Sequence, residues 1–348
     1  MKRITFFIGS LGRGGAERVI SILANHYCNK GWNVDIALLL DTKVGYELDE
    51  RIRIIDLTEC GNYVKAMPKW LIKIRKYIKT EHPDRIISFV GRINILVLTA
   101  KLGLKVKTIV SERNDPKHDG RGKAITFYTN LIYKNADAII YQTQYEKSCF
   151  SKNLNNKGYI IPNPVSVNAH RKCLTKNRIV AAGRLLPQKN HSLLIDAVAK
   201  LKDEYPGISL YIYGDGALKT ELENKVKSLN LSQIVYFPGN VVDLHEKISD
   251  AHVFVMSSEY EGLSNALIEA MMIGLPCITT DYPGADEVIQ DGVNGLIVSR
   301  ENIDELALGI KRIISDETLC ESLRNGAKEA SRKYDTDVVL RQWDEVIE

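Results

Sequence analysis

Three short segments of the 348-residue sequence combine glycine with charged side chains that could bind a phosphorylated ligand. The first is the glycine-rich stretch GSLGRGGAE. Arg184 and Lys189 lie in the second, GRLLPQKN, while Glu261 and Glu269 lie in the third, EGLSNALIE. Cations neutralise phosphate oxygens, and carboxylates accept hydrogen bonds from hydroxyl groups. The three segments therefore have the chemistry to bind a ligand that carries both phosphates and hydroxyls.

The glycine-rich turn, residues 9–15, separates a predicted strand at 4–8 from a predicted helix at 16–29. Backbone N–H groups at such a helix start can approach an anion closely, which makes Gly14 and Gly15 candidates for phosphate contact. The dinucleotide pattern G-x-G-x-x-G fails here, because a glutamate stands where the third glycine would be. Glycines are also common in such turns for steric reasons, so the turn alone leaves both interpretations open.

The cations of the second segment follow a predicted strand at 179–182. At a strand end and helix start, Arg184 could engage two oxygens of a diphosphate and Lys189 could act as a point charge. Surface charges with no ligand can have the same spacing, so this segment is not decisive by itself.

The glutamates of the third segment flank the start of a predicted helix. Glu261 lies in the loop after a predicted strand at 253–256, and Glu269 lies one to two turns into the helix. Helix N–H groups between them could bind a phosphate, with a carboxylate available for hydroxyls on either side. Carboxylates near helix N-termini are also common structural features, so both readings stay open.

Apolar runs without alternation predict strands that are buried on both faces of parallel sheets, with helices between them. The stretch 162–177 interrupts this alternation with prolines and polar residues. We therefore predict two doubly wound α/β domains: 1–165, a linker at 166–177, 178–334, and a helix at 335–348 that returns to the first domain. The predicted strands are 4–8, 34–40, 85–90, 108–110, 138–141, 158–161, 179–182, 209–213, 234–237, 253–256 and 277–280.

Taken together, the segments resemble those of the retaining glycosyltransferases of family 4, which have the GT-B fold and use nucleotide sugars. The resemblance implies two Rossmann-like parallel-sheet domains facing a central cleft. It runs over nearly the whole chain, in family order, through GGAERV, SFVGRIN, SERNDP, IPNPV, GRLLPQKN, IYGDG, EGLSNALIEAM and DGVNGL.

On the donor side, the resemblance implies a role for each matching residue. Glu261 would hold hydroxyls of the donor sugar and Glu269 those of the ribose, while Arg184 and Lys189 would bind the diphosphate. Glu261, Arg184 and Lys189 are the catalytic candidates. The other donor-binding candidates are Gly14, Gly15, Gly214, Asp215, Gly216, Asn240, Val241, Gly262, Leu263, Ser264 and Asn265.

On the acceptor side, the candidates are Arg92, Asn94, Arg113 and His118. The family often has a histidine where this chain has Arg113, so that histidine's role does not transfer directly. Arg113 could itself bind a phosphate. His118 is close in sequence, although the sequence fits a solvated loop histidine as well.

The resemblance implies no cofactor and no metal, only a nucleotide sugar as co-substrate, with UDP the expected nucleotide. Fixed cations and helix N-termini can stabilise the charge that develops on the β-phosphate. The only D-x-D string, residues 335–337, precedes a predicted helix and is better interpreted as a cap than as a metal site.

The net charge of +4 conceals two halves of opposite sign. Residues 1–178 contain 31 Lys or Arg and 15 Asp or Glu, whereas residues 179–348 contain 16 and 28. A basic half attracts phosphates, anionic lipids or nucleic acid. Because the best apolar runs are interrupted by Arg92 and Glu269, no membrane span is expected, and any membrane contact would be peripheral.

The most basic segment, residues 65–79, predicts an amphipathic helix with Pro68 at its first position. The simpler interpretation has its apolar stripe in the core and its lysines in solvent. Alternatively, Lys69, Lys73 and Lys76 bind the anionic inner leaflet or the diphosphate of a lipid acceptor.

The sequence therefore predicts a metal-independent retaining glycosyltransferase, cytoplasmic and peripherally attached to the inner face of the cell membrane. It would transfer a hexose or N-acetylhexosamine from a UDP-sugar to a lipid-linked (polyprenyl diphosphate) glycan in bacterial surface polysaccharide or glycan biosynthesis. One alternative is a nucleotide-sugar epimerase of the same fold. Another is a basic nucleic-acid-binding protein, although the sequence has no recognition motif for nucleic acid.

Overall fold

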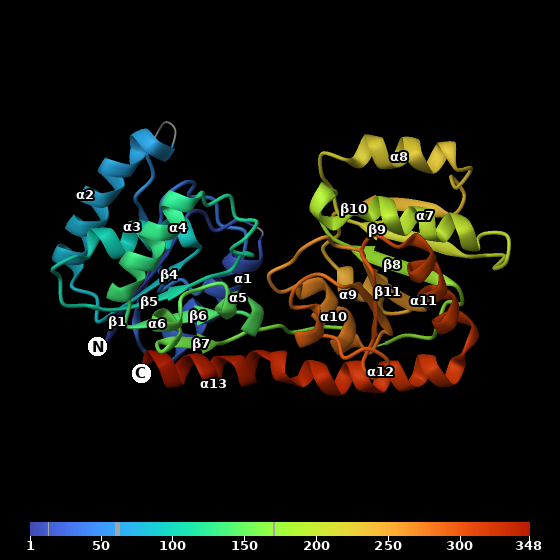
Figure 1. The fold of residues 1–348 in the computed structure, drawn as a ribbon. Helices are drawn as coiled ribbons and strands as arrows, with labels where there is room; N and C mark the ends of the chain where they lie inside the picture. Colours follow the sequence, from blue (N-terminus) through green and yellow to red (C-terminus); the bar gives the residue numbers. More distant parts are fainter. Residues whose placement is uncertain (13, 60–62, 170) are drawn as a thin grey trace. The chain divides into compact units, whose positions relative to one another are not determined.

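The computed structural model describes residues 1–12, 14–59, 63–169 and 171–348, and the chain divides into two compact units (Figure 1). The first unit comprises Met1–Pro164 together with Asp337–Glu348, and the second comprises Val165–Thr336. The segment predicted as a linker, 166–177, groups with the second unit. Its backbone is tied there because Lys172 N and Thr175 N donate hydrogen bonds to Ser249 O and Asp250 O, at 3.1 and 2.8 Å.

The first unit contains a seven-stranded sheet in the order β3-β2-β1-β4-β5-β6-β7, with every neighbouring pair parallel. Most of its strands are buried, as their apolar runs predict. The edge strand β3 is exposed along most of its length, which explains why no apolar run marks it. The strands are β1 (Arg3–Ile8), β2 (Asn33–Leu38), β3 (Arg53–Asp56), β4 (Arg85–Phe89), β5 (Lys107–Ser111), β6 (Ala138–Tyr141) and β7 (Gly158–Ile160).

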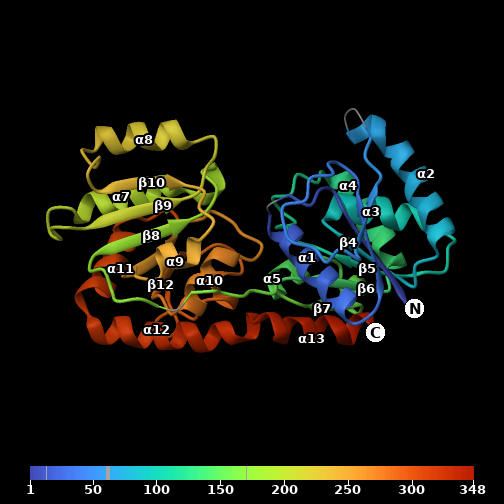
Figure 2. The same cartoon turned by 180° about the vertical axis from the view of Figure 1, so that it is seen from behind.

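Helices cover both faces of the first sheet, as the two opposite views show (Figures 1 and 2). On one face, α1 and α13 share a core that contains Leu23 and Trp343. On the other face, α2 and α3 share a core that contains Trp70 and Val97, and α4 packs beside α3. The helices are α1 (Gly15–Asn29), α2 (Tyr63–Glu81), α3 (Gly91–Ala100), α4 (Lys123–Ile132), α5 (Gln144–Ser148), α6 (Lys152–Asn155) and α13 (Thr336–Ile347).

Helix α13 belongs to the first unit through buried contacts. Trp343 is fully buried and stacks on Phe89 with a centroid distance of 6.0 Å. Tyr27 donates a hydrogen bond to Asp344 Oδ1 at 2.9 Å, and His26 Nε2 lies 3.0 Å from the same oxygen. The end of the described chain is therefore part of the core that its beginning forms.

Helix α2 begins earlier than predicted, so the assignment of Pro68 to its first position is wrong. Proline is the sixth residue of the helix, where its missing N–H removes one backbone hydrogen bond. The apolar stripe is confirmed as core, because Trp70, Ile74 and Ile78 are buried. Their packing explains how the helix tolerates an internal proline.

The second unit contains a six-stranded parallel sheet in the order β10-β9-β8-β11-β12-β13. Its last strand is only three residues long and was not predicted. The carboxyl ends of these strands lie at one edge, which brings the loops that follow them together. The strands are β8 (Arg178–Ala182), β9 (Ser209–Tyr213), β10 (Val235–Gly239), β11 (Val253–Met256), β12 (Cys277–Thr280) and β13 (Leu296–Val298).

Two hydrophobic cores lie on the two faces of the second sheet. One core contains residues of α7 and α11, such as Leu194 and Ile310, and the other contains residues of α10 and α12, such as Leu267 and Ala327. The helices of this unit are α7 (His191–Leu201), α8 (Lys219–Ser228), α9 (Leu244–Ile248), α10 (Asn265–Ile273), α11 (Ile303–Ser315) and α12 (Glu317–Ser331).

Candidate active site

The predicted donor residues of the second unit all follow four of its parallel strands. Arg184 and Lys189 follow β8, Gly214 follows β9, and Asn240 follows β10. Glu261 and the start of α10 follow β11. The four strands are parallel neighbours in the order β10-β9-β8-β11. Their carboxyl ends therefore place all of these residues at one edge of the sheet.

Close backbone contact between two of these loops requires glycine. Gly183 N donates to Tyr213 O at 2.9 Å, and Leu185 N donates to Asp215 O at 3.0 Å. Gly214 has φ +136°, and a Cβ there would lie 2.0 Å from the oxygen of Gly183. The glycines around Asp215 therefore allow the loop after β8 to lie against the loop after β9.

Glu261 and Lys189 form an ion pair that is largely buried. Lys189 Nζ lies 2.5 Å from Glu261 Oε1, and the two side chains are 15% and 8% exposed. Ser258 Oγ donates to the same carboxylate oxygen at 2.6 Å. The predicted diphosphate cation and the predicted sugar-binding carboxylate thus contact each other directly.

Several supporting residues were not predicted from the sequence. Ser258 is fully buried, and its carbonyl oxygen accepts from Thr280 Oγ1 at 2.5 Å. Gln188 Nε2 donates to Tyr260 O at 2.8 Å, which attaches the Lys189 turn to the Glu261 loop. Their positions in the sequence could have indicated both residues, because Ser258 lies two residues after the end of β11 and Gln188 directly precedes Lys189.

A short 3-10 turn, Pro187–Lys189, sets the direction of the lysine. Asn190 ends the turn in a left-handed conformation with φ 40°, and its side chain accepts a hydrogen bond from Leu193 N at the start of α7. Ser257 Oγ donates to Lys189 O at 3.0 Å. The backbone around Lys189 is therefore held both by α7 and by the end of β11. Arg184, in contrast, is exposed.

The start of α10 contains the remaining donor candidates. Ser264 is its N-cap and accepts from Leu267 N at 3.4 Å. Glu269, 6% exposed, lies on the following turns, with His245 Nε2 3.4 Å from its Oε2. Helix N-termini favour anions, so this position suits a phosphate. The neighbouring candidates are Gly262, Leu263 and Asn265, with Leu263 buried.

His191 is buried at the first position of α7, two residues after Lys189. Burial, which has the larger effect, and the nearby Lys189 ammonium together lower the pKa of His191 to about 4. The imidazole is therefore neutral at physiological pH, and it adds no charge to the neighbouring cations.

The glycine-rich turn of the first unit occupies the place that the sequence predicts, between β1 and α1. Gly14 is the N-cap of α1 and its carbonyl accepts from Tyr46 at 2.9 Å, while Gly15 is exposed at the first helical position. These N–H groups lie on the first unit, and the Lys189–Glu261 pair lies on the second.

The acceptor candidates gather at the carboxyl edge of the first sheet but differ in burial. Arg92 is exposed in the first turn of α3, whereas Asn94 is fully buried and donates to Ser111 O and Tyr133 Oη, both at 3.0 Å. His118 Nδ1 lies 2.6 Å from Asp115 Oδ2. Of these, Arg92 and the half-exposed His118 present polar groups at the surface.

Arg113 is directed into the first unit. It donates to Ser111 Oγ and to Asn163 Oδ1, both at 2.7 Å, and its guanidinium lies over the rings of Phe89 and Trp343. Contact between Arg113 and an acceptor phosphate would require the side chain to leave these partners, because it is only 7% exposed.

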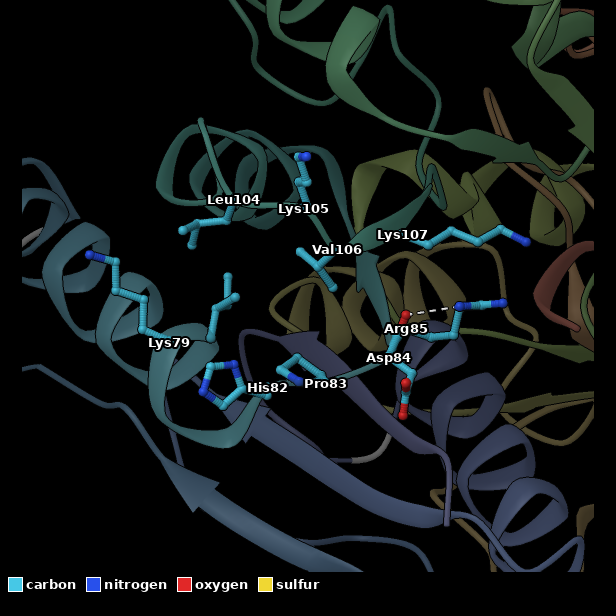
Figure 3. Close-up of a pocket in the computed structure, with 10 residues that line it drawn as sticks. Lys79, His82, Pro83, Asp84, Arg85, Leu104, Lys105, Val106 and Lys107 are labelled. Carbon is cyan, nitrogen blue, oxygen red and sulfur yellow. Dashed lines mark hydrogen bonds between the residues drawn. The ribbon is translucent and has the colours of Figure 1, made fainter.

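A separate pocket of about 480 Å³ lies at the amino edge of the first sheet (Figure 3). Its lining includes Lys79 near the end of α2, Lys105 just before β5, and Arg85 and Lys107, the first residues of β4 and β5. The pocket contains none of the predicted site residues. Within the described part of the chain, no helix is long and apolar enough to span a membrane, and no group of three or more His, Cys, Asp or Glu could hold a metal ion.

Two family models match successive parts of the chain. The glycosyl transferases group 1 model matches residues 164–330, and the glycosyltransferase family 4 model matches residues 13–169. The Campylobacter jejuni enzyme N-acetylgalactosamine-N,N'-diacetylbacillosaminyl-diphospho-undecaprenol 4-alpha-N-acetylgalactosaminyltransferase is 30% identical, with 98% of each chain covered. The amylovoran biosynthesis glycosyltransferase AmsD of Erwinia amylovora is 25% identical, with 99% of each chain covered.

Solved structures share the same architecture. HepE of Anabaena, crystallised with UDP, superposes with a TM-score of 0.84 at 18% identity over 99% of each chain. The lipopolysaccharide outer core galactosyltransferase WaaB superposes with a TM-score of 0.81 at 19% identity, again over 99% of each chain. Two parallel α/β units with these strand orders form the GT-B fold, and the family models and the 30% identical relative show the family. The chain belongs to the family 4, group 1 glycosyltransferases.

Proposed function

We propose that this glycosyltransferase transfers a hexose or N-acetylhexosamine, with retention and without a metal, from a UDP-sugar to a hydroxyl of a polyprenyl-diphosphate-linked glycan. The observation that carries the donor assignment is the buried Lys189–Glu261 pair beside the start of α10. The names of the relatives support the acceptor class and a place in bacterial surface polysaccharide or glycan biosynthesis, since they specify an undecaprenol diphosphate acceptor and amylovoran biosynthesis.

The cations at the carboxyl edge of the second sheet carry the leaving-group chemistry. When the bond between the sugar and the β-phosphate breaks, negative charge develops on the phosphate oxygens. Arg184 and Lys189, together with the N–H groups at the start of α10, supply positive charge that is already positioned there. These groups can take the place of a metal ion, and no cofactor is needed.

The carboxylates would bind hydroxyl groups. Ser258 and Lys189 hold the Glu261 carboxylate by its Oε1, so its Oε2 is left mainly to a weak contact with Gln188, at 3.5 Å. That oxygen can accept from a donor-sugar hydroxyl. Glu269, further along α10, would accept from the ribose. In a retaining reaction the departing diphosphate oxygen can itself accept the proton of the incoming hydroxyl.

Helix α2 would bring the enzyme to the cytoplasmic face of the membrane. Lys69, Lys76 and Lys79 lie on its exposed side, and Lys69 and Lys73 have Glu59 within 3.2 and 2.7 Å. Each cation near an anionic surface is worth on the order of 1 kcal/mol. Because Glu59 offsets part of the charge of its two partners, we expect Lys76→Glu to weaken binding to anionic vesicles more than Lys73→Glu.

Transfer can be tested directly with radiolabelled UDP-sugars and a polyprenyl-diphosphate glycan, with and without added chelator. We expect transfer in the presence of chelator, an anomeric configuration in the product that matches the donor, and loss of transfer in Glu261→Gln. Donor turnover without an acceptor and with release of a free epimer would instead support a nucleotide-sugar epimerase. Wild-type rates in Glu261→Gln would refute the site.

A further inference from the structure

The pocket at the amino edge of the first sheet has a lining of mixed chemistry (Figure 3). The lining comes from the end of α2 and the turn after it, from the start of β4, and from the residues that lead into β5. All of it belongs to the first unit. The volume of about 480 Å³ lies within the range of small-molecule sites, roughly 300–1,000 Å³. The pocket is therefore large enough for a small organic ligand.

Positive charge dominates the polar part of this lining. Lys79, His82 and Lys105 are exposed, and within the described part of the chain their side chains form no ion pair and no hydrogen bond. Lysine ammonium groups without a protein partner can bind the oxygens of an anionic ligand without first breaking another contact. The pocket therefore offers cations that are available to a ligand.

The acidic side chains of this region do not neutralise those cations. Glu81, at the end of α2, forms ion pairs with Arg3 and Arg53. Asp84 lines the pocket, and its Oδ2 accepts a hydrogen bond from Arg3 N at 2.7 Å. Neither carboxylate forms an ion pair with a lysine of the pocket, so the lining keeps a positive charge. The Oδ1 atom of Asp84 remains available to a hydroxyl group.

Arg85 and Lys107 add positive charge that is fixed in position. Arg85 Nε donates to Ile347 O at 2.8 Å, and Lys107 Nζ donates to Val346 O at 2.9 Å, both in the last turn of α13. Burial, which has the largest effect, and the nearby Arg85 guanidinium lower the pKa of Lys107. Because carbonyl oxygens carry only partial charges, these contacts leave most of the positive charge to attract an anion.

Apolar side chains form the rest of the lining. Leu104 and Val106 lie on one side of the pocket in Figure 3, and His82 and Pro83 lie on the other. Apolar walls on two sides suit a flat ring, and an imidazole can stack on a nucleotide base. Cations, apolar walls and one carboxylate oxygen are the groups that phosphates, a base and a ribose would contact.

We propose that this pocket binds a nucleoside phosphate. The base lies between the apolar walls, the phosphates contact Lys79 and Lys105, and Asp84 accepts a hydrogen bond from a ribose hydroxyl. The site is separate from the donor site, because its lining contains none of the donor or acceptor candidates. The inference goes beyond the proposed function and does not depend on it, since every residue that carries it belongs to the first unit.

The first test is calorimetry of the full chain with ADP, which carries a diphosphate on a base other than that of the proposed donor. In Lys79→Glu/Lys105→Glu we expect binding at this site to be weaker by roughly tenfold or more. Both lysines are exposed, so the substitutions leave the core intact, and melting curves check this. The matched control is Lys134→Glu/Lys152→Glu, which reverses two exposed lysines of the same unit outside the lining and should bind like wild type. Identical titrations of wild type and the pocket variant overturn the proposal.

Lysine acetylation, read by mass spectrometry, shows where ADP binds. We expect ADP to protect Lys79 and Lys105 from acetylation and to leave Lys152 unchanged. Protection of Lys189 without protection of Lys79 and Lys105 would place ADP in the donor site and overturn the proposal.

Two further probes determine the class of ligand. Inorganic pyrophosphate lacks the base and the ribose, so we expect it to protect the same lysines only at concentrations roughly tenfold or more above those of ADP. Equal protection by pyrophosphate would show a general site for small polyanions and would contradict the nucleoside assignment. A polyglutamate peptide that protects these lysines where ADP does not would identify an acidic protein segment as the occupant, and would also overturn the proposal.

Discussion

Replacing Lys189 by methionine should destabilise the second unit as well as abolish transfer. Methionine has a similar length but no charge, so the Glu261 carboxylate would keep only Ser258 and the weak Gln188 contact. Removing one partner of a buried ion pair costs about 3–5 kcal/mol. Since the two side chains are 15% and 8% exposed, we expect the lower end of that range, about 3 kcal/mol.

The same pair predicts a rescue. In Lys189→Met/Glu261→Gln no buried charge remains, so we expect the double variant to recover to within about 1 kcal/mol of wild type. For a unit of this size, 3 kcal/mol corresponds to a melting point lower by roughly 6–12 °C. Transfer should be absent in both variants, because both lack Lys189, the buried one of the two proposed diphosphate cations. The double variant would therefore regain stability without regaining transfer.

Circular dichroism is the suitable probe for this cycle. All three tryptophans, Trp32, Trp70 and Trp343, belong to the first unit. Their fluorescence therefore reports the unfolding of the first unit, whereas the substitutions lie in the second. The reasoning is refuted if Lys189→Met melts within 1 °C of wild type, or if the double variant is no more stable than the single one.

Three further predictions concern other parts of the fold. The pKa of His191 is about 4 in the folded protein, against an ordinary 6.5. Because the unfolded chain takes up the proton at a higher pH, the fold has its full stability above pH 6.5 and loses it as the pH falls toward 4. Between these values wild type should lose about 3 kcal/mol more than His191→Phe, as measured by urea unfolding at each pH. Gly214→Ala should lower the free energy of unfolding by more than about 3 kcal/mol and weaken UDP binding in calorimetry, because the new Cβ would collide with Gly183 O. The control is Gly207→Ala, where φ is also positive but the space is open, and it should lower the free energy of unfolding by only about 1 kcal/mol. Trp343→Ala should destabilise the first unit by about 3–5 kcal/mol in thermal melts, whereas a loss below 1 kcal/mol would show that α13 is dispensable there.

The sequence predicts the buried strands well because burial on both faces leaves a continuous apolar run. It misses β3, whose residues are largely exposed at the sheet edge, and β13, which is too short to form a recognisable run. The sequence also misplaces the start of α2. Proline often occupies the first position of a helix, but Pro68 lies inside this one.

The contacts within the site were beyond the reach of the sequence. Lys189 and Glu261 are separated by 72 positions, and only the pairing of β8 with β11, with Ile179 opposite Val253, brings them together. The roles of Ser258 and Gln188 depend on that same register. Similarly, the sequence shows Asn94 and Arg113 as polar residues after strands, but not that the first unit buries both.

The division of the chain has a consequence for its synthesis. Residues 165–336 form the second unit, and they are made before Asp337–Glu348, which complete the first unit. Trp343 fills a core that Phe89 and Leu23 have left open until then. The first unit can therefore complete this core only after the whole second unit has been translated.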